Sequence, residues 1–204
     1  MWIGLVGSEM CIRDSLYTAP WPGQGFYTKF PVNSVSDFSG KKLRIYSTAT
    51  QQMGSMLGFN ATILPFAEIP QAFSTGLIEA LFTSPQTGID IQAWDNTKHF
   101  TYAGAIFSKN AVVVTKKAFN ALSKGDQSNM LAAAKKAELR GWEMSAETTK
   151  KQIDILKKNG MSSKNAPDEV ISKMKSIGLE MMKNWRSKAS PEANAVLDRY
   201  LSMR

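Results

Sequence analysis

One stretch of the chain decides its fold: KKLRIYSTATQQMGSMLGFNATILPFAEIPQAFSTGLIEALFT, residues 41–83. Short runs of β-branched and apolar residues alternate in it with runs of helical spacing, and turn residues separate them. We expect strands at 42–46, 60–64 and 77–83, with helices from Thr48 through Met56 and from Phe66 to Thr75 between them. This order is that of a parallel α/β sheet, in which ligands bind beyond the carboxyl ends of the strands. The loops after residues 46, 64 and 83 are therefore the predicted places for a binding site.

The chain around this stretch predicts a linker, two more strands and a helical half. Residues 16–40 mix prolines and glycines with aromatic residues, which suits short extended pieces joined by turns. Residues 100–106 and 110–115 are apolar and short enough to be buried strands. We divide the chain into a segment outside the fold at 1–15, a crossing segment and linker at 16–40, an α/β ligand-binding lobe at 41–115, and a helical part at 116–204.

The helical part is dominated by one long uninterrupted stretch, residues 126–159, which would make a helix of roughly 50 Å. Its apolar or small residues recur at helical spacing, so one narrow face is predicted to pack. They are Leu131, Leu139, Trp142, Ala146, Thr149, Ile153 and Leu156. A helix of this length suggests a strut across two lobes. Two further helices are expected, at 168–188 and from Pro191 toward Tyr200.

Composition and charge exclude several classes of protein. No apolar run approaches the roughly 18 to 20 residues that cross a bilayer. The 204 residues include one cysteine and one histidine, which leaves no intrachain disulfide, no cysteine-rich zinc site and no cluster of histidine ligands. The net charge of +8 is uneven, with −1 on residues 1–108 and +9 on residues 109–204. A solvated helix face explains the excess best, and a basic helical nucleic-acid-binding or other interaction module is the alternative.

Residues 1–15, MWIGLVGSEMCIRDS, are expected to lie outside the fold. The run LVGSEMCIRD at 5–14 resembles the conceptual translation of a sequencing-library adapter, and the segment lacks the basic start and cleavage site of a secretory leader. We therefore expect the natural gene to enter in mid-frame near Leu16, with whatever preceded it, including any signal peptide, lost, and Cys11 without a role.

The residues give a weak case for catalysis and one candidate for binding. A hydrolase would depend on His99, the one histidine, and no nucleophile motif accompanies it; Glu68 and Glu79 are the carboxylates available for acid/base work. Arg44 lies within an expected strand that leads to a predicted ligand loop, and its planar guanidinium could hold a carboxylate. An arginine on a solvated strand face is the equal alternative.

The runs DFSGKKLRIYST at 37–48 and MLGFNATILPFAEIPQAFSTGLIEA at 56–80 resemble the central motif of the solute-binding receptors of tripartite ATP-independent periplasmic (TRAP) transporters. The matching positions are Asp37, Gly40, Arg44, Leu57, Gly58, Pro65, Phe66, Glu68, Ala72, Thr75, Gly76 and Glu79, and the entry to the long helix at 122–127 matches as well. The resemblance covers essentially all of residues 16–204.

This resemblance implies a binding site rather than an active site. Arg44 would hold the substrate carboxylate, Ser47 and Phe66 would line the pocket, and Thr83 would occupy a position where many members have asparagine. Gln24 falls about where some members have a second basic residue, which favours a monocarboxylate over a dicarboxylate. No metal and no cofactor is implied.

The resemblance also implies a fold, a partner and a location. The expected fold is α/β and periplasmic-binding-protein-like: one α/β lobe, a long strut helix and C-terminal helices, with most of the N-terminal lobe missing. The expected function is capture of a small organic acid in the periplasm and its delivery to the membrane subunits of a TRAP transporter, without insertion into the membrane and without catalysis. With one lobe, only half of the cleft would be present.

Overall fold

The computed structural model describes residues 13–203, and residues 1–12, with Cys11, lie outside the described part. The described chain forms two compact units. Unit 1 contains the chain up to Tyr27 together with Thr83–Lys164, and unit 2 contains Thr28–Phe82 together with the chain from Asn165 onward. Within the described residues, no helix combines the length and the apolar character needed to span a bilayer.

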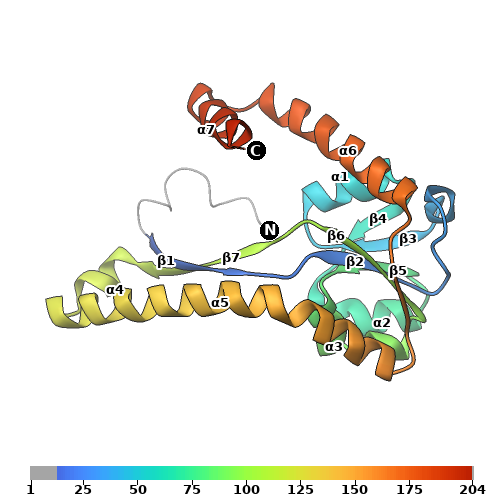
Figure 1. Ribbon diagram of the computed structural model, residues 1–204, viewed down its shortest axis with the longest axis horizontal. Coiled ribbons are helices and arrows are strands. Elements are labelled where there is room, and N and C mark those ends of the chain that lie inside the picture. The colour runs from blue at the N-terminus through green and yellow to red at the C-terminus, as the bar shows by residue number, and fades with distance from the viewer. Residues whose placement is uncertain (1–12, 204) are drawn as a thin grey trace. The chain divides into compact units, whose positions relative to one another are not determined.

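Unit 2 is built on three parallel strands in the order β4-β3-β5 (Figure 1). They are β3 (Lys42–Ile45), β4 (Asn60–Ile63) and β5 (Ala80–Thr83). The other elements are η1 (Val35–Phe38), α1 (Thr48–Met56), η2 (Phe66–Glu68), α2 (Ile69–Ser74), α6 (Asp168–Arg186) and α7 (Pro191–Ser202). The predicted α/β alternation of residues 41–83 is confirmed.

The core of unit 2 depends on a close approach of α1 to the sheet. A Cβ atom on Gly54 would lie 3.0 Å from both Ala61 Cβ and Leu43 Cδ2, so glycine lets the helix lie directly on β3 and β4. Phe38 and Phe59 stack with their ring centroids 4.5 Å apart. Because Leu43 faces α1, the alternation of side chains along β3 directs its neighbour Arg44 to the opposite face of the sheet.

Strand β5 begins at Ala80, three residues later than predicted. After α2 the chain turns at Gly76, whose φ is +71°, and the Ile78 N–H then donates to the carbonyl of Ala72 at 3.1 Å. Residues 77–79 therefore complete the end of the helix before the chain can join the sheet.

Unit 1 contains a two-stranded antiparallel ribbon and a second group of strands. The ribbon pairs β1 (Arg13–Pro20) with β7 (Lys109–Thr115), and the group has the order β2-β6-β8, from β2 (Gln24–Thr28), β6 (His99–Ala105) and β8 (Ser162–Asn165). The helices are α3 (Pro85–Asp90), η3 (Ala93–Asp95), α4 (Lys116–Asn120) and α5 (Lys124–Lys158). The expected long helix is confirmed as α5, whose 35 residues correspond to about 52 Å.

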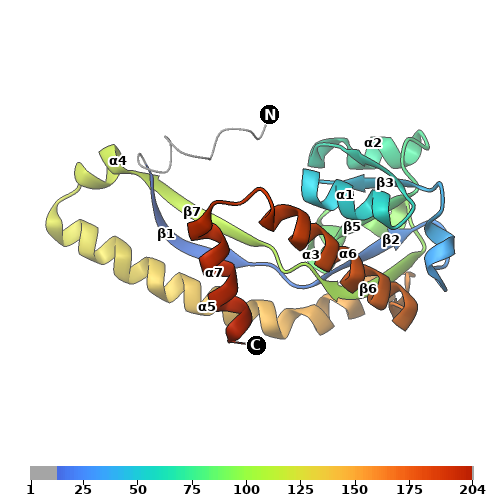
Figure 2. The ribbon, with the colours of Figure 1, turned by 90° about the horizontal axis from the view of Figure 1, so that it is seen from above.

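Helix α5 lies alongside the ribbon, as both views show (Figures 1 and 2). The Glu138 carboxylate accepts hydrogen bonds from the backbone N–H and the hydroxyl of Thr18, at 2.9 and 2.7 Å, and these bonds lower the pKa of Glu138. Gly141 leaves room for Pro20, whose Cδ would lie 3.4 Å from an added Cβ. Small and polar side chains thus make this contact.

The structure corrects the prediction that residues 110–115 form a buried strand, and it corrects the N-terminal part of the face of the long helix that was predicted to pack. Val113 in β7 is 46% exposed and Trp142 in α5 is 49% exposed, and Leu131 and Leu139 are exposed as well. Among residues 13–203, strand β7 pairs with β1 alone in a two-stranded ribbon. Of the predicted face of α5, Leu156 is buried and Thr149 and Ile153 are half-buried. This end of the helix contacts α3, where Gln152 Nε2 donates to Gln86 Oε1 at 2.9 Å.

The boundary of the N-terminal segment also changes. Strand β1 begins at Arg13, and Arg13, Asp14 and Ser15 pair with Thr115, Val114 and Val113 of β7. Residues 13–15, which were expected to lie outside the fold, therefore extend the ribbon.

Tyr27 provides a test of unit 1 through the pH dependence of its stability. Its side chain is fully buried, and its hydroxyl donates to the carbonyl oxygens of Ser84 and Pro85, each at 3.3 Å. Burial raises the pKa of Tyr27 well above its usual value, and the Asp90 carboxylate raises it further. Above about pH 10 the unfolded chain loses a proton that the folded chain keeps. The free energy of unfolding should therefore fall with rising pH, by about 1.4 kcal/mol per pH unit from this group.

We expect Tyr27→Phe to flatten this dependence. At pH 8 the variant should be less stable by about 1 kcal/mol, since two carbonyls lose their donor, and between pH 10 and 11 its disadvantage should shrink. Urea unfolding of both proteins at pH 8, 10 and 11 measures the effect. Equal slopes for the two proteins would contradict the assignment to Tyr27.

Candidate functional site

Arg44 is the centre of the candidate site. It is 5% exposed. Among the residues whose burial the structure describes, it is the one charged residue that is buried. Its Nε donates to the carbonyl oxygen of Leu64, directly after β4, at 3.0 Å. Arg44 is therefore not an arginine on a solvated strand face, the alternative that the sequence left open.

The environment of Arg44 leaves its positive charge uncompensated by protein carboxylates. Among residues 13–203, no Asp or Glu forms an ion pair with it. Burial lowers the pKa of the guanidinium, and the neighbouring Tyr46 partly opposes this shift. Because Nε is held by Leu64, the two terminal nitrogens, Nη1 and Nη2, remain as the donors that can meet a carboxylate.

Two aromatic side chains lie at the same edge of unit 2 as Arg44. Tyr46 follows β3, and its ring centroid lies 6.0 Å from Arg44 Cζ; Phe66 begins η2, two residues after Leu64. Tyr46 is 36% and Phe66 51% exposed. Tyr46 was not among the residues predicted from the sequence, although the expected strand at 42–46 would have placed its side chain on the same face as that of Arg44.

Ser47 has a structural role that is visible in its hydrogen bonds. It is the N-cap of α1: its hydroxyl accepts from the N–H of Thr50 at 3.2 Å, and the Thr50 hydroxyl accepts from the N–H of Ser47 at 3.1 Å. The cap brings the start of α1 to the carboxyl end of β3. Ser47 therefore lies near Arg44 along the chain, and a role in ligand binding stays a prediction.

We expect Ser47→Ala to lower the free energy of unfolding by about 1 kcal/mol, the usual cost of an N-cap. Asparagine caps helices as well as serine does, so Ser47→Asn should keep most of the stability. Chemical unfolding of the two variants beside the unchanged chain measures the difference. A Ser47→Ala variant as stable as the unchanged chain would show that the cap is dispensable.

The remaining two predicted contacts lie in unit 1. Gln24 is buried at the start of β2, and its Nε2 donates to Ser108 Oγ at 3.0 Å. Thr83 is buried as the last residue of β5 and is followed by Ser84, the N-cap of α3. The structure thus places Arg44, Ser47 and Phe66 in unit 2 and Gln24 and Thr83 in unit 1.

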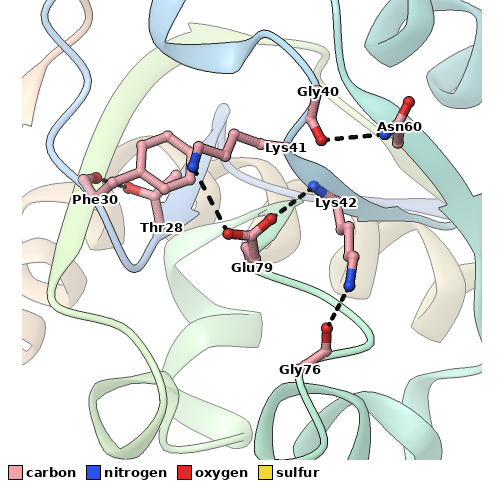
Figure 3. A network of polar contacts seen from close by, with 8 residues as sticks. All are labelled: Thr28, Phe30, Gly40, Lys41, Lys42, Asn60, Gly76 and Glu79. Atoms are coloured by element: carbon pink, nitrogen blue, oxygen red, sulfur yellow. Dashed lines mark hydrogen bonds and ion pairs between the residues drawn. The ribbon is translucent and has the colours of Figure 1, made fainter.

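Glu79, one of the two carboxylates considered for acid/base work, belongs to a structural network of polar contacts. Glu79 lies at the amino end of β5, where its carboxylate accepts from the Lys42 N–H at 3.3 Å and lies 3.8 Å from Lys41 Nζ (Figure 3). The Lys42 ammonium donates to the Gly76 carbonyl at 3.0 Å in the same network. This network joins the strand starts, at the opposite end of the strands from the Arg44 loop.

Other chemistry has little support in the described chain. His99 is the first residue of β6 and is half-buried. Glu68 ends η2 and is exposed. In residues 13–203 no three His, Cys, Asp or Glu side chains gather as metal ligands would.

Residues 23–188 match the family described as "Bacterial extracellular solute-binding protein, family 7", or DctP. Among solved structures, DctP7, an extracytoplasmic solute receptor from Bordetella pertussis that binds pyroglutamic acid, is 38% identical over 94% of this chain, with a TM-score of 0.90. DctP6 of the same organism, which also binds pyroglutamic acid, is 34% identical over 93% of this chain, with a TM-score of 0.88.

A third similar structure is a TRAP solute-binding protein of an unidentified microbe from a marine metagenome, described as specific for pyroglutamate. It is 33% identical over 93% of this chain, with a TM-score of 0.86. The chain spans 64%, 63% and 62% of the lengths of DctP7, DctP6 and the marine protein.

Proposed function

Because the chain belongs to family 7 of the bacterial extracellular solute-binding proteins, the DctP family of TRAP receptors, we propose that it captures a small monocarboxylate outside the cytoplasm for TRAP-type transport. Pyroglutamate is the first candidate ligand, since three relatives that are 33–38% identical are described as binding it. The members of the family are receptors, and no catalytic step is proposed.

The observation that carries this proposal is the buried guanidinium of Arg44. A cation removed from water and left without a carboxylate is unfavourable, and a bound anion would supply the missing partner. Its Nε already donates to the Leu64 carbonyl. The two terminal nitrogens, Nη1 and Nη2, can therefore donate in parallel to the two oxygens of one carboxylate.

A single strong cation favours an acid with one carboxylate. Gln24, which was predicted near a second basic position, is neutral and hydrogen-bonded to Ser108. We propose Ser47, Phe66, Thr83 and Gln24 as further ligand contacts, on the basis of the family resemblance.

Capture would work through a shift of population. Pairing of the carboxylate with Arg44 stabilises the ligand-bound conformation relative to the free one. The stabilisation equals the difference between the ligand's binding free energies to the two conformations. The membrane subunits of the transporter would then recognise that conformation. This step requires the membrane subunits as partners, and we propose neither a metal nor a cofactor for it.

Titration of the 204-residue chain with pyroglutamate, followed by NMR, tests the proposal. The Arg44 Nε–Hε signal reports on the site directly, because this group is hydrogen-bonded and buried. Hydrogen bonds to a charged group contribute about 1.5–3 kcal/mol, which alone corresponds to dissociation constants of roughly 5–80 mM, so the titration should extend to about 100 mM. We expect a saturable shift of this signal.

Pyroglutamide, in which a neutral amide replaces the carboxylate, is the matched control ligand. It should leave the Arg44 signal unchanged at the same concentrations. An equal response to acid and amide, or a response to the acid that bypasses Arg44, would overturn the proposed role of the carboxylate.

A further inference from the structure

We infer that Tyr46 is the positioning residue for Arg44, and that with Phe66 it selects acids whose carboxylate is joined to a flat ring. The selectivity part of this inference rests on the proposed function. The positioning part concerns the free protein and stands separately.

The contact between Arg44 and the residue that follows β3 carries the positioning part. Tyr46 comes directly after Ile45, the last residue of β3, and lies in the bend before α1. The 6.0 Å between Arg44 Cζ and the Tyr46 ring centroid is within the range of a cation–π contact. The guanidinium is thus held by the Leu64 carbonyl through Nε and by an aromatic ring through its charge, and both contacts restrict the plane in which Nη1 and Nη2 are presented.

The ligand class follows from what surrounds this cation. Tyr46 directly follows β3, and Phe66 lies two residues beyond Leu64, the residue whose carbonyl accepts from Arg44 Nε. Strands β3 and β4 are parallel neighbours in register, with Ile45 opposite Ile63. Both aromatic rings are therefore near the same edge and partly exposed, and a flat ring attached to the carboxylate would find aromatic surface there.

Tyr46→Leu and Tyr46→Phe test both parts. In the free protein, the Arg44 Hε proton of Tyr46→Leu should exchange with water about three to ten times faster, as loss of a cation–π contact predicts, while Tyr46→Phe keeps the ring and should stay close to the unchanged chain. In titrations, the ratio of the acetate to the pyroglutamate dissociation constant should fall by about the same factor in Tyr46→Leu only.

Tyr200→Leu is the control, since Tyr200 is also an exposed tyrosine of unit 2 but lies on α7. It should change neither readout, and unfolding curves of all variants identify any that are merely destabilised. Equal Hε exchange in Tyr46→Leu and Tyr46→Phe would overturn the positioning role. An unchanged acetate-to-pyroglutamate ratio would overturn the selectivity. Absence of binding to either acid by the unchanged chain would refute the proposed function and with it the selectivity, while the exchange experiment would still decide the positioning.

Discussion

Gly88→Ala should be the most destabilising small substitution in unit 1. A Cβ atom at this position of α3 would lie 2.0 Å from the hydroxyl oxygen and 2.3 Å from Cζ of Tyr27. The tyrosine cannot move away easily, because it is fully buried and its ring centroid lies 4.4 Å from that of Phe100. We expect a loss near the upper end of the 1–3 kcal/mol typical of overpacking, and a melting temperature lower by about 5–10 °C.

Gly178→Ala is the matched control for this prediction. Gly178 lies inside α6, and an added Cβ would meet no atom within 4 Å. The same chemical change should therefore raise stability by about 0.5–1 kcal/mol, the usual advantage of alanine over glycine in a helix. Thermal and urea unfolding of both variants would show opposite signs. If Gly88→Ala were as stable as Gly178→Ala, the close packing of α3 on Tyr27 would be refuted.

The elements of residues 41–83 could be predicted because their signals are local. Ser47 caps α1, and Gly58 follows its end with a φ of +95°. Such signals act within a few residues, so the chain itself carries them. The same reasoning found the long helix to within two residues at each end.

The faces that these elements bury could not be predicted in the same way. The continuous apolar run of β7 suggested a buried strand, but its neighbour in the structure is β1, about 95 residues away in sequence, and no third strand from the described part of the chain joins the ribbon. The contact of Gly88 with Tyr27 is likewise distant in sequence. Spacing along the chain predicts which residues share a face and leaves open what covers that face.

The candidate site, too, could be predicted only in part from the sequence. The strand position of Arg44 identified it as a candidate from the sequence, but its burial depends on neighbouring strands and its hydrogen bond joins it to Leu64, 20 residues away. Tyr46 was missed because spacing along the chain does not show how closely its ring approaches the guanidinium. Its distance from the guanidinium was needed to suggest a role.

The second large effect is expected at Arg44 itself, where two substitutions should both weaken binding but should change the free energy of unfolding differently. In Arg44→Lys, the ammonium cannot present two parallel donors, so pyroglutamate binding should weaken by about 1.5–3 kcal/mol, or roughly 10- to 150-fold. The buried charge stays while the Nε bond to Leu64 is lost, so stability should also fall, by about 1 kcal/mol. Arg199→Lys on the exposed surface of α7 is the control, and both quantities should stay unchanged in it.

In Arg44→Met, binding should disappear while the free energy of unfolding rises or stays level. Methionine has a similar length and fills the space without charge, so the cost of burying an unpaired cation is removed; replacing buried charges by apolar residues is often neutral or stabilising. The Leu64 carbonyl loses its donor, but Leu64 is only half-buried and water can replace it. NMR titration and urea unfolding of the same samples measure the two quantities. Residues that serve function at the expense of stability show this pattern. A loss of more than about 2 kcal/mol in Arg44→Met, comparable to removing one member of a buried polar network, would mean that the arginine is held there for the fold, and the proposed carboxylate site would lose its main support.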